Sequence, residues 1–294
     1  MKVFVTGASG FVGSAIVQEL LEAGHKVLGL ARSDASAAAV VAAGAEVHRG
    51  SLEDLESLKR GAVASDGVIH SAFIHDFSDM AAAGRTDNLA IEALGAALEG
   101  SGRALITTSG MAGLGTGQIA TEDDPVDPNV ANHRTASDLT TLNLASRGVR
   151  SMLVRLPPSV HDIGDYGFVP RIINIARQKG VSAYVNDGLN RWPAVHRLDA
   201  ARLYRLALEK GVAGNRYHAI GDQGVAIKAL AETIGKHLNM PVVSKSLAEA
   251  SEHFGFLGYF LAADLRVSVD LTRERLGWNP VQPGLISDLE QHYF

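Results

Sequence analysis

The chain contains no cysteine, which excludes disulfide bonds, thiol nucleophiles and cysteine-ligated metals. No apolar run approaches the roughly 20 residues that a bilayer-spanning helix needs. The formal net charge is −5, so the chain has no excess of positive charge that would indicate binding to nucleic acid or to an anionic membrane. The apolar stretch before the first glycine is too short for a signal peptide, and we expect a cytoplasmic protein.

Two catalytic signatures are also missing. The 11 histidines form neither H-E-x-x-H nor another metal-binding spacing, so we expect no metal. No G-x-S-x-G segment is present, which argues against a serine hydrolase of the nucleophile-elbow type.

Short apolar strands alternate with helical stretches up to Leu156. Strand-like segments cover residues 2–7, 25–31, 45–50, 66–73, 103–110 and 149–157, and helical stretches lie between them. Strands that alternate with helices form a parallel sheet covered on both faces. We therefore predict an α/β fold with a doubly wound parallel sheet of the Rossmann type.

A glycine-rich turn, "TGASGFVG", joins the first strand to the first helix. Gly7 would allow the tight turn, Gly10 the approach of a pyrophosphate, and Gly13 close packing of the helix on the sheet. The helix N-terminus would offer N–H groups to phosphates. We interpret the turn as a dinucleotide cradle to which Ser9, Phe11 and Val12 also contribute; the alternative is a plain packing turn.

The end of the second strand indicates which dinucleotide binds. An acidic residue there would bind the ribose 2′-hydroxyl of NAD, but the sequence has Arg32 and Ser33. A guanidinium and a hydroxyl can hold a 2′-phosphate, which favours NADP. The alternative is that Arg32 is a solvated loop cation.

The alternation breaks down after Leu156, where prolines and glycines become frequent. Helical stretches return further on, at "DAARLYRLALEKG", "IKALAETIGKHL" and "DLTRERLG". We predict a dinucleotide-binding domain over residues 1–156. Residues 157–294 would form mainly a smaller substrate-side lobe, interleaved with the end of the sheet.

Several segments in order resemble the extended or atypical short-chain dehydrogenase/reductases, the group that contains the NAD-dependent epimerase/dehydratases. "TGASGFVG" looks like the family's T-G-x-x-G-x-x-G, and "HRGSLED" resembles its G-D-x-x-D segment. "GVIHSAF", "RLDAARLYRLALEK" and "TRERLGWNP" are similar to later family segments. The resemblance covers nearly the whole chain.

The resemblance implies a nicotinamide across the carboxyl edge of the sheet. Ser51 and Leu52 would flank the adenine. The other implied cofactor contacts are Ser71, Ala72, Phe73, Asn88, Thr107, Pro157, Ser159 and Val160. Homodimers through the helices beside the fourth and fifth strands are common in the wider family, and the resemblance extends that option to this chain.

The family's catalytic pair is not present. Its members use a hydroxyl from the fifth strand and a Tyr-x-x-x-Lys pair on the next helix, whose tyrosine moves the proton. Thr108 or Ser109 can supply the hydroxyl, but the next helical stretch has no tyrosine and no lysine. In the register that we favour, uncertain by one residue, Arg134 replaces the lysine and Val130 the tyrosine. Arginine can hold the ribose; valine cannot move a proton.

Other side chains are candidates for the missing function. His133 and His161 are predicted proton donors, since both would titrate near neutrality if unperturbed. His75 and Asp76 are predicted substrate contacts, because their loop often lines the cleft in the family. Tyr166 and Tyr184 could each supply a phenol.

We expect an NADP-dependent oxidoreductase that moves hydride between NADPH and a carbonyl or alcohol of a small organic molecule. Its proton donor would be non-standard, or the reaction would rely on the hydroxyl and water. A second hypothesis is a protein that is not an enzyme but binds the cofactor as a sensor or regulator. A nucleotide-sugar epimerase or dehydratase is a third, although it too would need a base at the tyrosine position.

Overall fold

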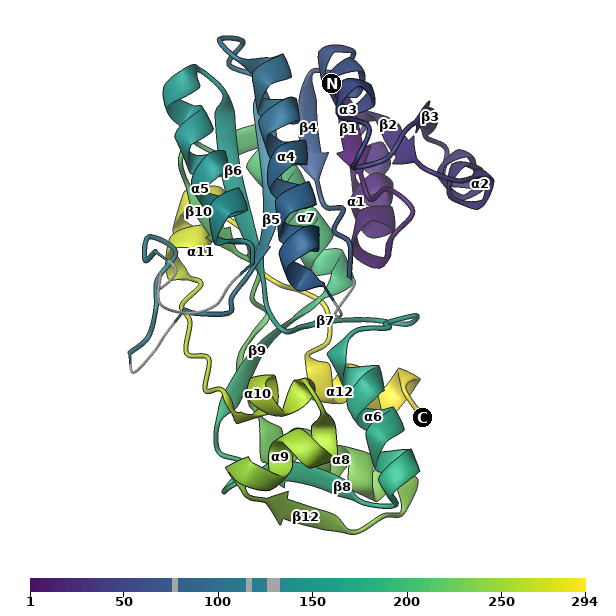
Figure 1. Cartoon of the computed structure of the whole chain (residues 1–294), viewed down its shortest axis with the longest axis vertical. Helices are drawn as coiled ribbons and strands as arrows, with labels where there is room; N and C mark the ends of the chain where they lie inside the picture. Colours follow the sequence, from purple (N-terminus) through teal and green to yellow (C-terminus); the bar gives the residue numbers. More distant parts are fainter. Residues whose placement is uncertain (76–78, 115–117, 126–132) are drawn as a thin grey trace.

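The computed structural model describes residues 1–75, 79–114, 118–125 and 133–294, which form two lobes (Figure 1). The larger lobe is built on a seven-stranded sheet in the order β10-β6-β5-β4-β1-β2-β3, and every strand pair in it is parallel. The strands are β1 (Lys2–Thr6), β2 (Lys26–Ala31), β3 (Glu46–Arg49), β4 (Gly67–His70), β5 (Ala104–Gly110), β6 (Arg150–Leu156) and β10 (Arg216–His218). The predicted α/β fold is confirmed.

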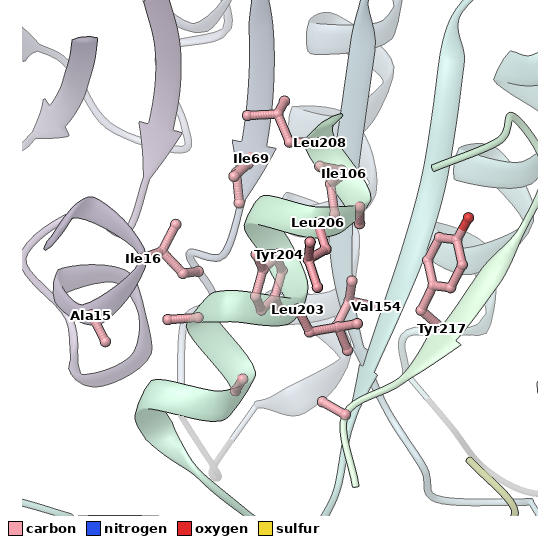
Figure 2. Close-up of a cluster of buried hydrophobic side chains, with 14 of the residues drawn as sticks. Ala15, Ile16, Ile69, Ile106, Val154, Leu203, Tyr204, Leu206, Leu208 and Tyr217 are labelled. Carbon is pink, nitrogen blue, oxygen red and sulfur yellow. The ribbon is translucent and has the colours of Figure 1, made fainter. Parts of the chain in front are cut away.

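Helices cover both faces of this sheet. One face carries α1 (Phe11–Glu22), α2 (Asp34–Ala42), α7 (Arg197–Lys210) and α11 (Asp270–Leu276), and the other carries α3 (Leu55–Val63), α4 (Met80–Leu98) and α5 (Thr135–Asn143). Figure 2 shows Ile16 of α1 and Leu203 of α7 packed near Ile69, Ile106 and Val154 of the strands. Burial of these apolar side chains is the main source of the lobe's stability.

The smaller lobe holds two further sheets. One joins β7 (Ser159–His161), β9 (Arg191–His196) and β11 (Asp222–Ala226), and the other joins β8 (Ser182–Val185) and β12 (Val242–Lys245). Its helices are α6 (Phe168–Lys179), α8 (Ile227–Leu238), α9 (Leu247–Phe254), α10 (Leu257–Ala262) and α12 (Leu285–His292). The chain returns to the larger lobe for α7, β10 and α11 (Figure 1). None of the described helices combines the length and apolar character of a membrane span.

Two helix boundaries differ from the sequence prediction. Residues 85–102, between the fourth and fifth strands, have the spacing of a helix, but α4 begins earlier, at Met80, because the Asp79 side chain accepts the Ala82 N–H at 2.9 Å and caps the first turn. Helix α5 is shorter than predicted and ends at Asn143. A short 3₁₀ turn and Gly148, with φ of 73°, follow it.

The turn between β1 and α1 depends on glycine at two positions. Gly7 has a φ of +73°, which side chains disfavour. A Cβ atom at Gly13 would lie 1.9 Å from the Gly7 carbonyl oxygen. The first turn of α1 therefore rests directly on the backbone at the end of β1.

Replacing Gly13 by alanine should destabilise the fold, since the obstructing atom is backbone and cannot rotate away. We expect Gly13→Ala to lower the free energy of unfolding by about 1–3 kcal/mol or more, measured by urea denaturation. Gly110→Ala is the matched control, because a Cβ there meets no atom within 4 Å. A Gly13→Ala protein as stable as the Gly110→Ala protein would contradict this description of the turn.

Candidate functional site

A cavity of about 920 Å³ lies between the two lobes, along the carboxyl edge of the larger sheet. Its walls come from the loops after β1, β2, β3, β4 and β5, and, across from them, from the start of α6 and from α10. Cavities of this size at the carboxyl ends of parallel strands are typical ligand sites. Most of the residues predicted to bind cofactor line it: Gly7, Ser9, Gly10, Phe11, Val12, Gly13, Arg32, Ser51, Leu52, Ser71, Ala72, Phe73, Arg134, Pro157, Ser159 and Val160.

The N-terminus of α1 opens onto this cavity. Gly10 caps the helix, and its own N–H donates to the Gly7 carbonyl at 2.8 Å. The next N–H, that of Phe11, donates only a long hydrogen bond of 3.4 Å, to the Tyr166 hydroxyl. This helix N-terminus fits a pyrophosphate, because Gly7 and Gly10 carry no Cβ atom that would obstruct the approach of the phosphate oxygens.

Arg32 stands at the far end of the cavity, directly after β2. Its side chain is exposed and forms no ion pair with another described residue. Ser33 does not line the cavity, because its hydroxyl caps α2 and accepts the Ser36 N–H at 3.2 Å. Ser36 lines the cavity in its place. Asp34 points to Arg49, with 2.6 Å between carboxylate and guanidinium.

Arg134 reaches the opposite end of the cavity from the start of α5. Its guanidinium lies 4.2 Å from the centre of the Phe73 ring and donates to the Thr108 carbonyl oxygen. It also approaches the Asp87 carboxylate at 3.4 Å, and His70 contacts the same oxygen at 3.1 Å. Burial alone would raise the pKa of Asp87, but the charge of Arg134 and the hydrogen bond from His70 hold it below its ordinary value. These contacts fix the guanidinium at the edge of β4 and β5.

Three consecutive residues near the end of β5, Thr107, Thr108 and Ser109, carry hydroxyl groups, which point to different faces of the sheet. Thr107 shares a hydrogen bond of 2.9 Å with Thr141 of α5 and does not line the cavity. The Thr108 hydroxyl points to α7 and contacts the Tyr204 hydroxyl of that helix at 2.7 Å. It also donates a hydrogen bond to the His70 carbonyl oxygen of β4. The Ser109 hydroxyl points back towards α5. Thr108 and Ser109 both line the cavity, but the Thr108 hydroxyl is engaged in the core.

Ser109 donates to a buried carboxyl group that the sequence analysis did not single out. Its hydroxyl lies 2.9 Å from Oδ2 of Asp138, whose side chain is 5% exposed. Oδ1 of Asp138 has no hydrogen-bond partner among the described residues. Burial raises the pKa of Asp138 to about 6, against the Ser109 hydrogen bond and the positive charges of Arg134 and Arg155. Asp138 is four residues after Arg134, so the two share a helix face.

Both predicted histidine proton donors lie outside the cavity lining. His161 belongs to β7 and is buried in the smaller lobe, where its Nδ1 lies 2.7 Å from the Asp288 carboxylate. Burial also lowers the pKa of His161. His133 is exposed and packs against Gly84 of α4. Neither of the two predicted proton donors is therefore brought to the cavity by the fold.

Asn88 is likewise displaced from its predicted place. Its side-chain oxygen accepts a hydrogen bond from the Thr140 hydroxyl of α5 at 2.8 Å, and it does not line the cavity. The preceding residue, Asp87, points inward instead and contacts Arg134. Successive residues of a helix point about 100° apart, so Asp87 contacts His70 and Arg134 while Asn88 contacts α5.

The substrate side of the cavity is mostly apolar. Phe168, Phe260 and Leu265 contribute to it, and His75 and Arg171 add polar groups. Burial and the charge of Arg134 lower the pKa of His75. Tyr166 lines the cavity as well, whereas Tyr184 does not. Asp76 and Val130 lie outside the described residues.

A second polar cluster lies in the smaller lobe. Single ligand atoms of Asp162, His196 and Asp288 come within 4.8 Å of one another. Arg197 already pairs with Asp162 at 2.9 Å, and His161 pairs with Asp288. The cluster thus ties together β7, β9 and α12.

The family of the chain follows from comparison with known proteins. Residues 3–220 match the model of the NAD dependent epimerase/dehydratase family, and the chain belongs to this family. An uncharacterized protein of Schizosaccharomyces pombe is 53% identical, over 98% of each chain. A UDP-glucose 4-epimerase of Streptomyces lividans is 26% identical over 97% of this chain and 93% of its own. A 4-hydroxy-2-methyl-3-oxo-4-farnesyl-3,4-dihydroquinoline-1-oxide ketoreductase of Stigmatella aurantiaca is 28% identical over 87% and 80%.

Solved structures of the same architecture support the fold. The dTDP-glucose 4,6-dehydratase DesIV of Streptomyces venezuelae, solved with NAD and TYD bound, superposes with a TM-score of 0.79. It is 21% identical, and the alignment covers 100% of this chain and 96% of that one. At this identity the likeness establishes the fold, and the particular chemistry has to be argued from the side chains of this chain.

Replacing Asp138 should stabilise the protein at neutral pH. Folding raises the pKa of this carboxyl from 3.8 to about 6, so ionising it costs the folded state more than the unfolded state. The stability that depends on a protonated Asp138 is fully present below pH 3.8 and is lost as the pH rises through 6. We expect Asp138→Asn to match the wild type at pH 3.5 and to exceed it by up to ~3 kcal/mol at pH 8.

Urea denaturation across this pH range measures the difference. Asp288→Asn is the matched control with the opposite sign, because the histidine partners lower the pKa of Asp288 despite its burial. That variant should lose stability relative to the wild type at neutral pH. A difference between Asp138→Asn and the wild type that does not change with pH would contradict the raised pKa.

Proposed function

We propose that this protein is an NADP-dependent oxidoreductase that reduces the carbonyl group of a small, partly apolar organic molecule or oxidises the matching alcohol. The observation that carries the proposal is the continuity of one cavity. Because the strands lie in the order β5-β4-β1-β2, its lining passes from the exposed Arg32 after β2, past the N-terminus of α1 after β1, to Ser109 of β5 and to apolar walls. In this order, the groups suit the 2′-phosphate and the pyrophosphate of a nicotinamide dinucleotide and then the carbonyl of a substrate.

Arg32 supports the choice of NADP. Arg32 follows β2, where a carboxylate would bind the 2′-hydroxyl of NAD, and its guanidinium forms no ion pair among the described residues. A guanidinium binds a phosphate through charge-assisted hydrogen bonds that a 2′-hydroxyl cannot match. The nearby carboxylate of Asp34 is turned to Arg49.

The other end of the cavity supports carbonyl chemistry. NADPH, when bound, supplies a hydride to the carbonyl carbon. Ser109 would hydrogen-bond the carbonyl oxygen, because this residue lines the cavity and the hydroxyl of Thr108, which also lines it, is held by Tyr204. Arg134, fixed by Thr108 and Asp87, would hold the nicotinamide ribose. Phe168 and Phe260 would contact the apolar part of the substrate.

Two relatives whose names describe reductases support reductive chemistry. One is a ketoreductase, and another, from Stenotrophomonas maltophilia, is a 2-alkyl-3-oxoalkanoate reductase that is 28% identical over 84% of this chain and 79% of its own. Both names print an oxo group on a molecule that also carries a farnesyl or an alkyl chain. The apolar walls of this cavity suit a substrate of that kind.

The reaction is tested by NADPH oxidation with hexanal, cyclohexanone and ethyl acetoacetate, followed by absorbance. We expect turnover of at least one of them. Tight NADPH binding without turnover of any would contradict the proposal and favour a cofactor-sensing protein. Conversion of UDP-glucose in place of the carbonyl panel would favour an epimerase.

The choice of cofactor is tested by Arg32→Ala. Loss of the charge-assisted contacts should weaken NADPH binding by about 10- to 100-fold and leave NADH binding unchanged, as measured by calorimetry. Arg60→Ala is the control, since it removes an exposed cation from α3 outside the cavity lining. Unchanged NADPH affinity in Arg32→Ala would show that this residue does not read the 2′-phosphate.

A further inference from the structure

We propose that Asp138 supplies the proton for carbonyl reduction through Ser109, so that a serine–aspartic acid pair takes the place of the family's tyrosine. The inference rests on the proposed reductase function and assigns the proton donor that this function lacks. Asp138 does not line the cavity. It acts through Ser109 and is a positioning and proton-relay residue.

The geometry of the pair carries the proposal. Ser109 is 1% exposed and lines the cavity from β5, and Asp138 stands behind it on α5 with 2.9 Å between the two oxygens. The distance suits direct proton transfer along the hydrogen bond. The remaining oxygen of Asp138, Oδ1, is buried without a hydrogen-bond partner among the described residues. Such an environment disfavours a permanent carboxylate, since an ionised group there lacks solvation.

The protonation state of Asp138 decides where the Ser109 hydrogen points. Beside a carboxylate, the serine hydroxyl donates to Oδ2, as the structure shows. When Oδ2 carries a proton, the carboxylic acid donates to Ser109 Oγ, and the serine hydrogen is released for an acceptor in the cavity. A protonated Asp138 therefore orients Ser109 to donate to a carbonyl oxygen.

The proton transfer can then be written in full. The carbonyl carbon accepts a hydride, that is, hydrogen with two electrons, from the reduced nicotinamide, and the carbon–oxygen π bond breaks. The carbonyl oxygen takes the hydrogen of Ser109 as a proton, and Ser109 takes the proton of Asp138. The products are an alcohol, the oxidised cofactor and the Asp138 carboxylate, which solvent protonates before the next turnover.

The charges around Asp138 balance its two states. Arg134, the N-cap residue of α5, and Arg155 on β6 favour the carboxylate, while burial and Asp87 on α4 favour the acid. Arg155 is itself buried, and its guanidinium donates to the Asp124 carbonyl at 3.0 Å. A proton donor whose acid and base forms are similar in free energy near the working pH is the most effective kind. The site thus meets the requirement that the missing tyrosine would have met.

The first test needs neither cofactor nor substrate. Carbon-13 NMR of aspartate carboxyls in the cofactor-free protein, with the Asp138 signal assigned by its loss in Asp138→Asn, should show titration near pH 6. Ser109→Ala should move this titration to higher pH, because the serine hydrogen bond favours the carboxylate. Asp288→Asn should leave it in place. An Asp138 carboxyl that is fully ionised at pH 5 would overturn the proposal.

The second test is the pH profile of reduction, with whichever of the three panel carbonyls the wild type reduces fastest. In the wild type kcat should fall as the pH rises past about 6, since the reaction consumes the protonated form. Asp138→Asn should lower kcat by about 10²-fold or more, change KM little and remove the inflection. Asp288→Asn, which changes a buried carboxyl group outside the cavity lining, should keep the wild-type profile.

The outcomes separate this inference from the function on which it rests. A wild-type protein that reduces no panel carbonyl overturns the reductase and the relay together. A wild-type protein that does reduce one, with an Asp138→Asn variant of equal kcat and the same inflection, overturns the relay alone. Loss of activity in Asp138→Asn with an unchanged inflection would mean that Asp138 only supports the position of Ser109, and would also overturn it.

Discussion

The candidate site depends on the contact between Gly13 and the Gly7 carbonyl. Because neither residue carries a side chain, the first turn of α1 rests on the end of β1, and its N–H groups open onto the carboxyl edge of the sheet. A methyl group at Gly13 would push the helix away and with it the N-terminus that suits a pyrophosphate. The rest of the cavity follows from this placement, since the parallel strands bring the loops after β2, β4 and β5 to the same edge.

The two-residue alternation of a strand then distinguishes the hydroxyls at the end of β5. Thr107 and Ser109 point to α5, and Thr108 points to α7, where Tyr204 and the His70 carbonyl hold it in the core. Of the three residues, Ser109 lines the cavity and its hydroxyl contacts the carboxyl group of Asp138. The pair of Ser109 and Asp138 thus offers a chemical replacement for the family's catalytic tyrosine, which is missing from the helical stretch after the fifth strand.

The sequence predicted the parts of the site that local rules govern. The glycine spacing, the strand–turn–helix setting and Arg32 after the second strand all follow from short-range geometry, and these residues line the cavity. The places of His161 and Asp138 depend on contacts between distant segments. His161 pairs with Asp288, 127 residues away, and Asp138 with Ser109, 29 residues away. No periodicity in "RTASD", residues 134–138, indicates that its aspartate is buried, and the four-residue spacing from Arg134 indicates only a shared helix face.

The central claim is that one cavity joins a bound dinucleotide to a carbonyl that Ser109 holds. The most direct measurement is transfer of deuterium from NADPH labelled at the transferable C4 position to a carbonyl of the panel, read by mass spectrometry of the alcohol. The account predicts an alcohol carrying one deuterium on the carbinol carbon, and loss of that product in Ser109→Ala. An unlabelled alcohol, or equal labelling by the Ser109→Ala protein, would contradict it.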